Sequence, residues 1–110
     1  MNRQTFLGEF EMLVLLAVLR LKGDAYGVTI LREIEERAGR VVARGALYVT
    51  LDRLEGKGYL RSRMADPSPE RGGRAKRYYG VERAGIAALQ DSRTAISGLW
   101  QGLEPIIGKL

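Results

Sequence analysis

The first forty residues contain two stretches in which apolar positions recur at helical spacing. Between residues 7 and 22 the apolar side chains return every three or four positions, and acidic residues stand in the first turn, where the helix dipole favours them. A second stretch, after Asp24, has one apolar and one charged face and stops at Gly39, a residue typical of helix ends. The pattern predicts two helices in succession.

A third helix is predicted over residues 43–58. Leu47, Leu51 and Leu54 fall within about 60° of one another at about 100° per residue, so all three should face a core. The other face carries a different set of residues: Gly45, Val49, Asp52, Arg53 and Gly56. Tyr48 lies at the edge between the two faces, so its ring can pack while its hydroxyl reaches the outside.

After Gly58 the period changes from helical to alternating. Every second residue within 60–64 is an arginine, and residues 76–81 likewise alternate between two sets of side chains that would point to opposite faces of a strand. The stretch between these two segments is rich in Pro and Gly. We therefore expect a hairpin. Three helices followed by a hairpin describe a mainly α (α+β) fold, the winged helix-turn-helix, whose third helix enters the DNA major groove while the wing reaches the backbone or minor groove.

Composition narrows the possible chemistry. The 110 residues suit one domain, and the lack of Cys and His removes disulfides, thiolate nucleophiles, Ser-His triads and nearly every zinc site. The 13 acidic residues are scattered or lie among basic neighbours, so we expect no enzyme, no metal site and no cofactor. The longest apolar stretch, residues 12–19, is too short to cross a bilayer, and we find no secretory signal, which predicts a cytoplasmic protein without a membrane partner.

The net charge of +5 is concentrated in the middle of the chain. Residues 40–83 carry a net charge of +6, whereas residues 1–39 carry −1 and residues 84–110 carry zero. A basic block within an otherwise neutral domain is typical of a surface that binds nucleic acid. The alternative is a solvated basic surface that serves solubility alone.

Two runs of residues in this central region match a known pattern when they are taken together. They are GALYVTLDRLEGKGYL at residues 45–60 and RAKRYYGVERAG at residues 74–85. In combination they closely resemble the PadR family of bacterial winged-helix transcriptional regulators, over about residues 8–90. Three places depart from the family pattern: Val49 stands where many relatives have Pro, Tyr26-Gly27-Val28 replaces His-Gly-Tyr, and Glu82 replaces the Thr before the last helix.

The resemblance implies a homodimeric, repressor-like regulator that binds a palindromic operator on double-stranded DNA and often releases it when a small aromatic or hydrophobic effector binds. The chain resembles the short class of the family, with a single C-terminal helix. We expect residues 1–82 to form the winged-helix DNA-binding domain and residues 83–110 to form a dimerisation helix, within one structural unit. A rival from another class is a winged-helix protein-interaction module that binds no nucleic acid.

The last helix supports the homodimer independently of the resemblance. Its apolar positions step by three and four residues, as in a coiled-coil seam, and Pro105 should break the helix before Ile107. The seam consists of Ile86, Leu89, Arg93, Ile96, Trp100 and Leu103. In a two-fold dimer Trp100 would lie near the Trp100 of the other subunit or near that subunit's first helix around Phe6 and Phe10, and we expect these three residues to line an effector pocket. The alternatives are a helix that packs on its own domain and a tryptophan that only anchors the dimer.

The candidate DNA contacts lie on the third helix and the wing. Arginines there suit phosphates or guanine edges, and a glycine leaves room for the backbone to approach DNA. The set is Arg44, Gly45, Tyr48, Val49, Arg53, Arg71, Arg74, Lys76 and Arg77. The plainer alternatives are an arginine paired with a nearby acid, a tyrosine that belongs to the core, a helix-start glycine and a solvated loop. The negative charge of Asp52 would repel a DNA phosphate, unless Asp52 orients an arginine or accepts a hydrogen bond from a cytosine amine.

Overall fold

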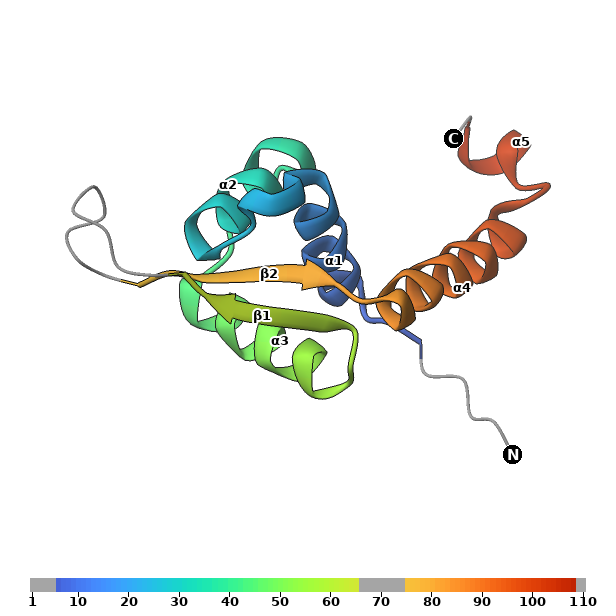
Figure 1. The fold of residues 1–110 in the computed structure, drawn as a ribbon. Helices are drawn as coiled ribbons and strands as arrows, with labels where there is room; N and C mark the ends of the chain where they lie inside the picture. The colour runs from blue at the N-terminus through green and yellow to red at the C-terminus, as the bar shows by residue number, and fades with distance from the viewer. Residues whose placement is uncertain (1–5, 66–74, 109–110) are drawn as a thin grey trace.

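The computed structural model describes residues 6–65 and 75–108 (Figure 1). The order of elements is α1 (Glu9–Leu21), the short 3₁₀ helix η1 (Lys22–Asp24), α2 (Gly27–Ala38), α3 (Arg44–Gly56), β1 (Leu60–Met64), β2 (Arg77–Val81), α4 (Arg83–Trp100) and α5 (Glu104–Ile107). Three helices followed by a two-stranded hairpin confirm the predicted winged helix-turn-helix. Among the described residues, no helix is both long and apolar enough to cross a membrane.

The core lies between the first three helices and one face of the hairpin. Its completely buried side chains include Leu15 of α1, Ile30 of α2, and the three leucines of α3 at positions 47, 51 and 54. Burying a side chain of this size is worth about 1.5–3 kcal/mol, so these residues account for much of the packing energy. The inward face predicted for the third helix is therefore confirmed, and its outward face is left free.

The hairpin is fastened to the helices at one edge. β1 and β2 run antiparallel, with Leu60 opposite Val81 and Ser62 opposite Tyr79. The Tyr79 N–H donates a hydrogen bond of 2.8 Å to the carbonyl oxygen of Ala25, in the segment between η1 and α2. Because this bond joins β2 to the start of α2, the base of the wing has a fixed position relative to the helices.

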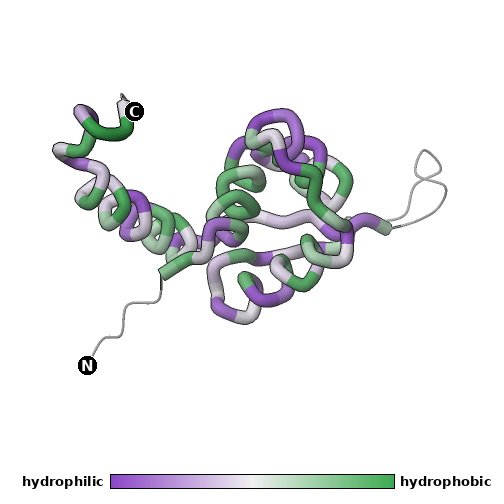
Figure 2. The backbone as a smooth tube through the Cα atoms, turned by 180° about the vertical axis from the view of Figure 1, so that it is seen from behind, coloured by the Kyte–Doolittle hydropathy of each residue, from purple (hydrophilic) through white to green (hydrophobic). Residues whose placement is uncertain are grey.

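Helix α4 leaves the body of the molecule and projects away from it (Figure 1). Its attachment is close, because a Cβ on Gly85 would collide with the carbonyl oxygen of Tyr59 and a methyl group of Val81. Beyond this point only Ser92 of the helix is buried, and the molecule extends 56 Å along its longest axis. Figure 2 shows hydrophobic positions recurring along the projecting helices, where the single chain leaves them uncovered.

The C-terminal segment ends its main helix earlier than the sequence predicts. Helix α4 stops at Trp100, and Gly102 takes a left-handed backbone with φ of 84°. Leu103, which we expected on the continuing seam, instead caps the separate helix α5, and Pro105 lies in the first turn of α5. Proline is tolerated in a first turn because no intrahelical hydrogen bond is lost there. The break therefore comes at Gln101 and Gly102 rather than at the proline.

Candidate nucleic-acid interface

Helix α3 presents the start of its outward face without obstruction. Arg44 is its first residue and is exposed, and a Cβ on Gly45 would meet no atom within 4 Å. Farther along the same face, Tyr48 and Val49 have exposed fractions of 42% and 59%. This face combines a cation, open backbone, a hydroxyl and an apolar side chain, which are the groups that contact phosphates and base edges.

Tyr48 occupies the position between core and solvent that its spacing predicts. Its hydroxyl lies against the first turn of α2, so closely that a Cβ on Gly27 would overlap it. Gly27 is buried and has ordinary helical geometry, so the small size of glycine is what this contact uses. The tyrosine therefore sets the approach of α2 to α3 while keeping part of its ring exposed.

Arg53 lies near the other end of α3 and has an acidic partner. Its guanidinium is 3.9 Å from a carboxylate oxygen of Glu11 in α1, and the Lys57 ammonium donates to the same oxygen at 2.9 Å. Burial raises the pKa of the Glu11 carboxyl, but the hydrogen bond from the Gly8 N–H and the Lys57 ammonium outweigh this effect and hold the pKa below its usual value. Half of the Arg53 side chain remains exposed, so pairing with Glu11 and contact with DNA are compatible.

The base of the wing carries the two described basic candidates of the hairpin. Arg77 donates a hydrogen bond of 2.9 Å to the Ser62 hydroxyl, which itself donates to Glu55 at 2.7 Å. The Lys76 ammonium lies 3.9 Å from the ring centroid of Tyr26. Arg71 and Arg74, the other two candidates of the wing, lie outside the described residues.

Three side chains beside these candidates were not singled out from the sequence. Tyr26 precedes α2 and meets the ring of Tyr78 edge to face, with centroids 5.3 Å apart. The guanidinium of Arg63 lies 5.0 Å from the Tyr78 centroid, and the two residues face each other across the strands. The alternation within residues 60–64 and 76–81 could have paired Arg63 with Tyr78, because it places both on the outer face of the hairpin.

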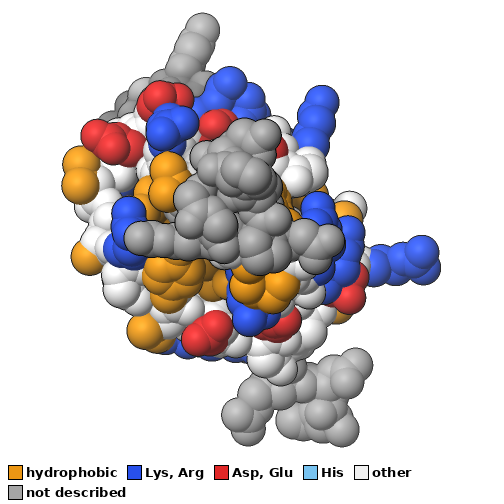
Figure 3. All heavy atoms as spheres, turned by 60° about the vertical axis from the view of Figure 1, so that its left-hand side comes forward, with side chains coloured by type: hydrophobic (Ala, Val, Ile, Leu, Met, Phe, Trp, Pro, Cys, Tyr) orange, Lys and Arg blue, Asp and Glu red, His pale blue; other side chains and the backbone are white. Residues whose placement is uncertain are grey.

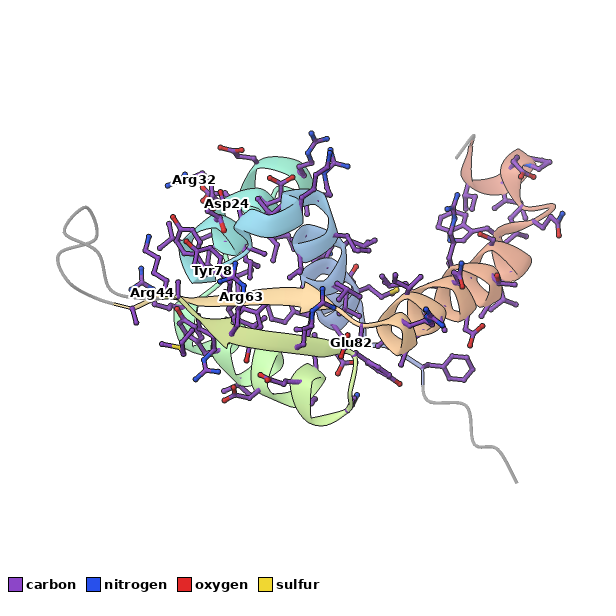
Figure 4. The ribbon with its side chains drawn as sticks, in the orientation of Figure 1. Asp24, Arg32, Arg44, Arg63, Tyr78 and Glu82 are labelled. Carbon is purple, nitrogen blue, oxygen red and sulfur yellow. The ribbon has the colours of Figure 1, made fainter. Side chains whose placement is uncertain are left out.

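Several basic side chains lie at the end of the molecule where α3 begins and the strands of the hairpin leave the body. Arg44, Arg63 and Tyr78 all lie towards this end in Figure 4. Figure 3 views the molecule from that side and shows Lys and Arg side chains at several points around the face, with hydrophobic side chains between them. The described residues include no group of three or more acidic side chains placed to hold a metal ion.

The residues predicted for dimerisation lie on the projecting part of the molecule. Ile86, Ile96 and Trp100 are each exposed by 40–45%, although they are apolar. Together with residues of α1 they line an open groove of about 520 Å³: Met12, Leu16, Leu19, Ile86, Leu89, Gln90, Arg93, Ile96, Ser97 and Trp100. The seam and the outer side of α1 therefore form one continuous apolar surface.

A second apolar hollow lies between α4 and α5. It measures about 290 Å³ and is lined by Ile96, Leu99, Trp100, Leu103 and Ile107. Of the aromatic residues expected near the effector, Phe6 is exposed, whereas Phe10 is partly buried against the core of its own chain. Trp100 borders both hollows, so it is the residue of this set best placed to meet a ligand.

Comparison with known proteins agrees with this geometry. The sequence model of the protein family described as "Transcriptional regulator PadR-like family" matches residues 15–91 of this chain. The transcriptional regulator Rv3488 of Mycobacterium tuberculosis is 40% identical over 78 residues, a match that spans 69% of this chain and 66% of the length of that relative.

Solved structures show the same fold. A PadR family transcriptional regulator of Eggerthella lenta superposes with a TM-score of 0.72 at 23% identity, covering 92% of this chain and 83% of the other. A PadR family regulator of Clostridium difficile gives a TM-score of 0.74 at 21% identity, covering 92% and 100%. At such identities the superpositions establish the winged-helix fold, while the family match rests on sequence. The chain belongs to the PadR-like family of transcriptional regulators.

Proposed function

We propose that this regulator binds double-stranded DNA through α3 and the base of the wing. The observation that carries the proposal is that the open face of α3 and the basic wing base lie at one end of the molecule. The residues that we expect to contact DNA on the described elements are Arg44, Gly45, Tyr48, Val49, Arg53, Lys76 and Arg77. Arg71 and Arg74 complete the set at the sequence level.

The residues of α3 have different roles in this proposal. Arg44, in the first turn, reaches phosphate or a guanine edge, and Gly45 lets the helix backbone approach the groove. Val49 offers an apolar contact of the kind that thymine methyl groups accept. Arg53, held beside Glu11, lies about one turn beyond Val49 and suits a phosphate at the edge of the site.

The apolar surface of α1 and α4 supports a homodimer as the DNA-binding form. A groove of about 520 Å³ between these helices, with a row of exposed apolar residues beside it, is costly to leave in water. A second copy would cover this surface through a two-fold axis, because the seam is able to face itself. Such a dimer presents two α3 helices to a palindromic operator, with half-sites about one helical turn apart.

Trp100 supports the proposal that the dimer responds to an effector. It borders two apolar hollows, and a planar aromatic or hydrophobic molecule between two indole rings would gain stacking and burial. Binding there would change how the subunits meet and release the operator, as a repressor that responds to a small molecule requires. Phe6 is exposed and close to the start of α1, where it would face the same region.

The experiment that tests DNA binding measures the affinity of the protein for duplex DNA against salt. Duplexes selected from a random pool and an unselected duplex of equal length are titrated by fluorescence anisotropy. We expect the selected sites to bind more tightly, and the logarithm of affinity to fall linearly with the logarithm of salt concentration. Arg44→Ala should weaken binding by about tenfold, as the loss of one good base or phosphate contact does.

The matched control is Arg37→Ala. Arg37 is an exposed arginine on α2 that pairs with Glu33, so its removal changes the net charge equally without touching the proposed interface. A loss equal to that of Arg44→Ala would show that only net charge matters. A folded wild-type protein without salt-dependent affinity for any duplex would favour a protein-interaction module instead.

A further inference from the structure

Four side chains at the base of the wing form an alternating ladder of cations and rings, Lys76–Tyr26–Tyr78–Arg63. The Lys76 ammonium lies 3.9 Å from the centroid of Tyr26, the two tyrosine rings meet edge to face at 5.3 Å, and the Arg63 guanidinium lies 5.0 Å from the centroid of Tyr78. These distances fall within the range of cation–π and aromatic pairs. The ladder therefore connects the start of α2 to both strands of the hairpin.

The backbone beneath the ladder is held firmly. The Tyr26 N–H donates a hydrogen bond of 3.0 Å to the hydroxyl oxygen of Thr29, and that hydroxyl donates to the carbonyl oxygen of Asp24 at 2.7 Å. The neighbouring Ala25 carbonyl accepts the bond from Tyr79 that fastens β2. The Tyr26 ring therefore has a fixed place beside the hairpin.

Lys76 lies where the described part of the wing begins. Its carbonyl oxygen accepts a hydrogen bond of 2.8 Å from the Ala65 N–H, which closes the hairpin one step beyond β1 and β2. Its side chain is half buried on the Tyr26 ring, whereas a solvated lysine samples many rotamers. A lysine already held in one position loses less freedom when it meets a phosphate.

We propose that Tyr26 is a positioning residue that holds the Lys76 ammonium, and with it the base of the wing, in the orientation that contacts the DNA backbone. This proposal rests on the DNA binding proposed above. Tyr26 acts through Lys76, and its ring face is the part that matters, since the hydroxyl group contributes little to a cation–π contact.

The first experiment needs no DNA. A lysine side chain above an aromatic face has its methylene protons shifted upfield in the NMR spectrum by the ring current. We expect upfield-shifted signals of Lys76 in the wild type and in Tyr26→Phe, and ordinary positions in Tyr26→Leu. Ordinary positions in the wild type would overturn the ladder, whatever the protein does with DNA.

The second experiment is a double-mutant cycle on DNA affinity at fixed salt, with the unselected duplex as the probe. We expect Tyr26→Phe to bind as the wild type does, and Tyr26→Leu and Lys76→Gln to weaken binding about three- to tenfold each. The double variant should bind no more weakly than Lys76→Gln alone, because the tyrosine has nothing left to hold. Circular dichroism at the binding temperature confirms that each variant is folded.

The control for this cycle is Arg61→Gln, which removes the same charge from the hairpin at a side chain that pairs with Glu82. Its effect and that of Tyr26→Leu should multiply, since the hydrogen-bond partners of Arg61 are Val81 and Glu82 rather than Tyr26 or Lys76. If the effects of Tyr26→Leu and Lys76→Gln multiply as well, Tyr26 does not act through Lys76 and the proposal is overturned. If the wild type binds no duplex, the failure belongs to the proposed function rather than to the ladder.

Discussion

Glu11 is an acidic residue whose carboxylate is almost enclosed, with 9% of its side chain exposed. It accepts hydrogen bonds from the Gly8 N–H and the Lys57 ammonium. Glu11→Gln removes the charge from both bonds while it keeps the shape of the side chain. We therefore expect the free energy of unfolding at neutral pH to fall by about 1–2 kcal/mol, measured by urea denaturation.

The same variant tests the pH dependence of stability. The pKa of the Glu11 carboxyl is lower in the folded than in the unfolded chain, so its contribution is present above the usual carboxyl pKa and is lost as pH falls through the folded value. The difference between wild type and Glu11→Gln should therefore shrink at acidic pH. A difference that stays constant from neutral pH to about pH 3 would contradict this account.

The matched control for Glu11 is Glu9→Gln in the same turn of α1. Glu9 forms an ion pair of 2.7 Å with Arg40, which lowers the pKa of the Glu9 carboxyl, but both side chains are exposed. Solvent screens such a pair, so we expect a much smaller change in stability than for Glu11→Gln.

At the scale of the elements, the packing of α2 on α3 depends on the absence of a side chain at Gly27. Gly27→Ala would place a Cβ on the Tyr48 hydroxyl, and either the ring or the helix must move. We expect a loss of about 1–2 kcal/mol in the free energy of unfolding, which exceeds the gain in helix propensity. Thermal or urea unfolding measures this loss.

A second substitution isolates the cause of that loss. Y48F removes the hydroxyl that a new Cβ would overlap, so Gly27→Ala should cost less in the Y48F background than in the wild type. Equal costs in the two backgrounds would show that overlap with the Tyr48 hydroxyl does not explain the effect.

The sequence predicts best the helices and strands whose position and buried face follow from the spacing of their own residues. Leu47, Leu51 and Leu54 show which face of α3 is buried, and the alternation after Gly58 locates both strands of the hairpin. The end of α4 was harder to predict, because the apolar spacing continues past Trp100 and the helix is interrupted by the backbone angles of Gln101 and Gly102.

Contacts between residues that lie far apart in the chain could not be predicted from the sequence. Glu11 and Arg53 meet because α1 packs beside α3, a relation that no local spacing contains. Tyr26 and Lys76 meet because a backbone bond joins the start of α2 to β2. By contrast, the position of Arg44 at the start of α3 follows from the helix boundary alone, and the structure agrees with it.

At the scale of the whole molecule, the proposed dimer predicts how a variant of the seam should behave. Ile96→Glu would bury a charge at the contact between subunits, so the dissociation constant of the dimer should rise by at least about 100-fold. Light scattering should give the wild type twice the mass of one chain at micromolar concentration and the variant the mass of one.

The control for the seam is Thr94→Glu. Thr94 lies about 160° around α4 from Ile96, so an added acid there should leave the dimer intact. A wild-type protein with the mass of a single chain at micromolar concentration would contradict the proposed dimer, and so would equal dissociation of the two variants.

The effector proposal concerns both subunits together, and the single tryptophan makes it measurable. We expect a planar aromatic compound that releases the operator to quench the fluorescence of Trp100 over the same concentration range. Trp100→Leu should keep the dimer and lose most of the response. A variant that keeps both the dimer and the full response would place the effector site elsewhere.

Because α4 projects from the body, a small rotation of this helix in the proposed dimer would move the DNA-binding part of each subunit over a larger distance. The helix is attached near Gly85 and runs for 18 residues, which at 1.5 Å each is about 27 Å. A rotation of α4 by about 10° about a point at its Trp100 end would therefore displace each DNA-binding body by about 5 Å, more than the rise of about 3.4 Å between base pairs. A ligand bound far from the DNA needs only to change the angle between two helices for the half-sites to fall out of register.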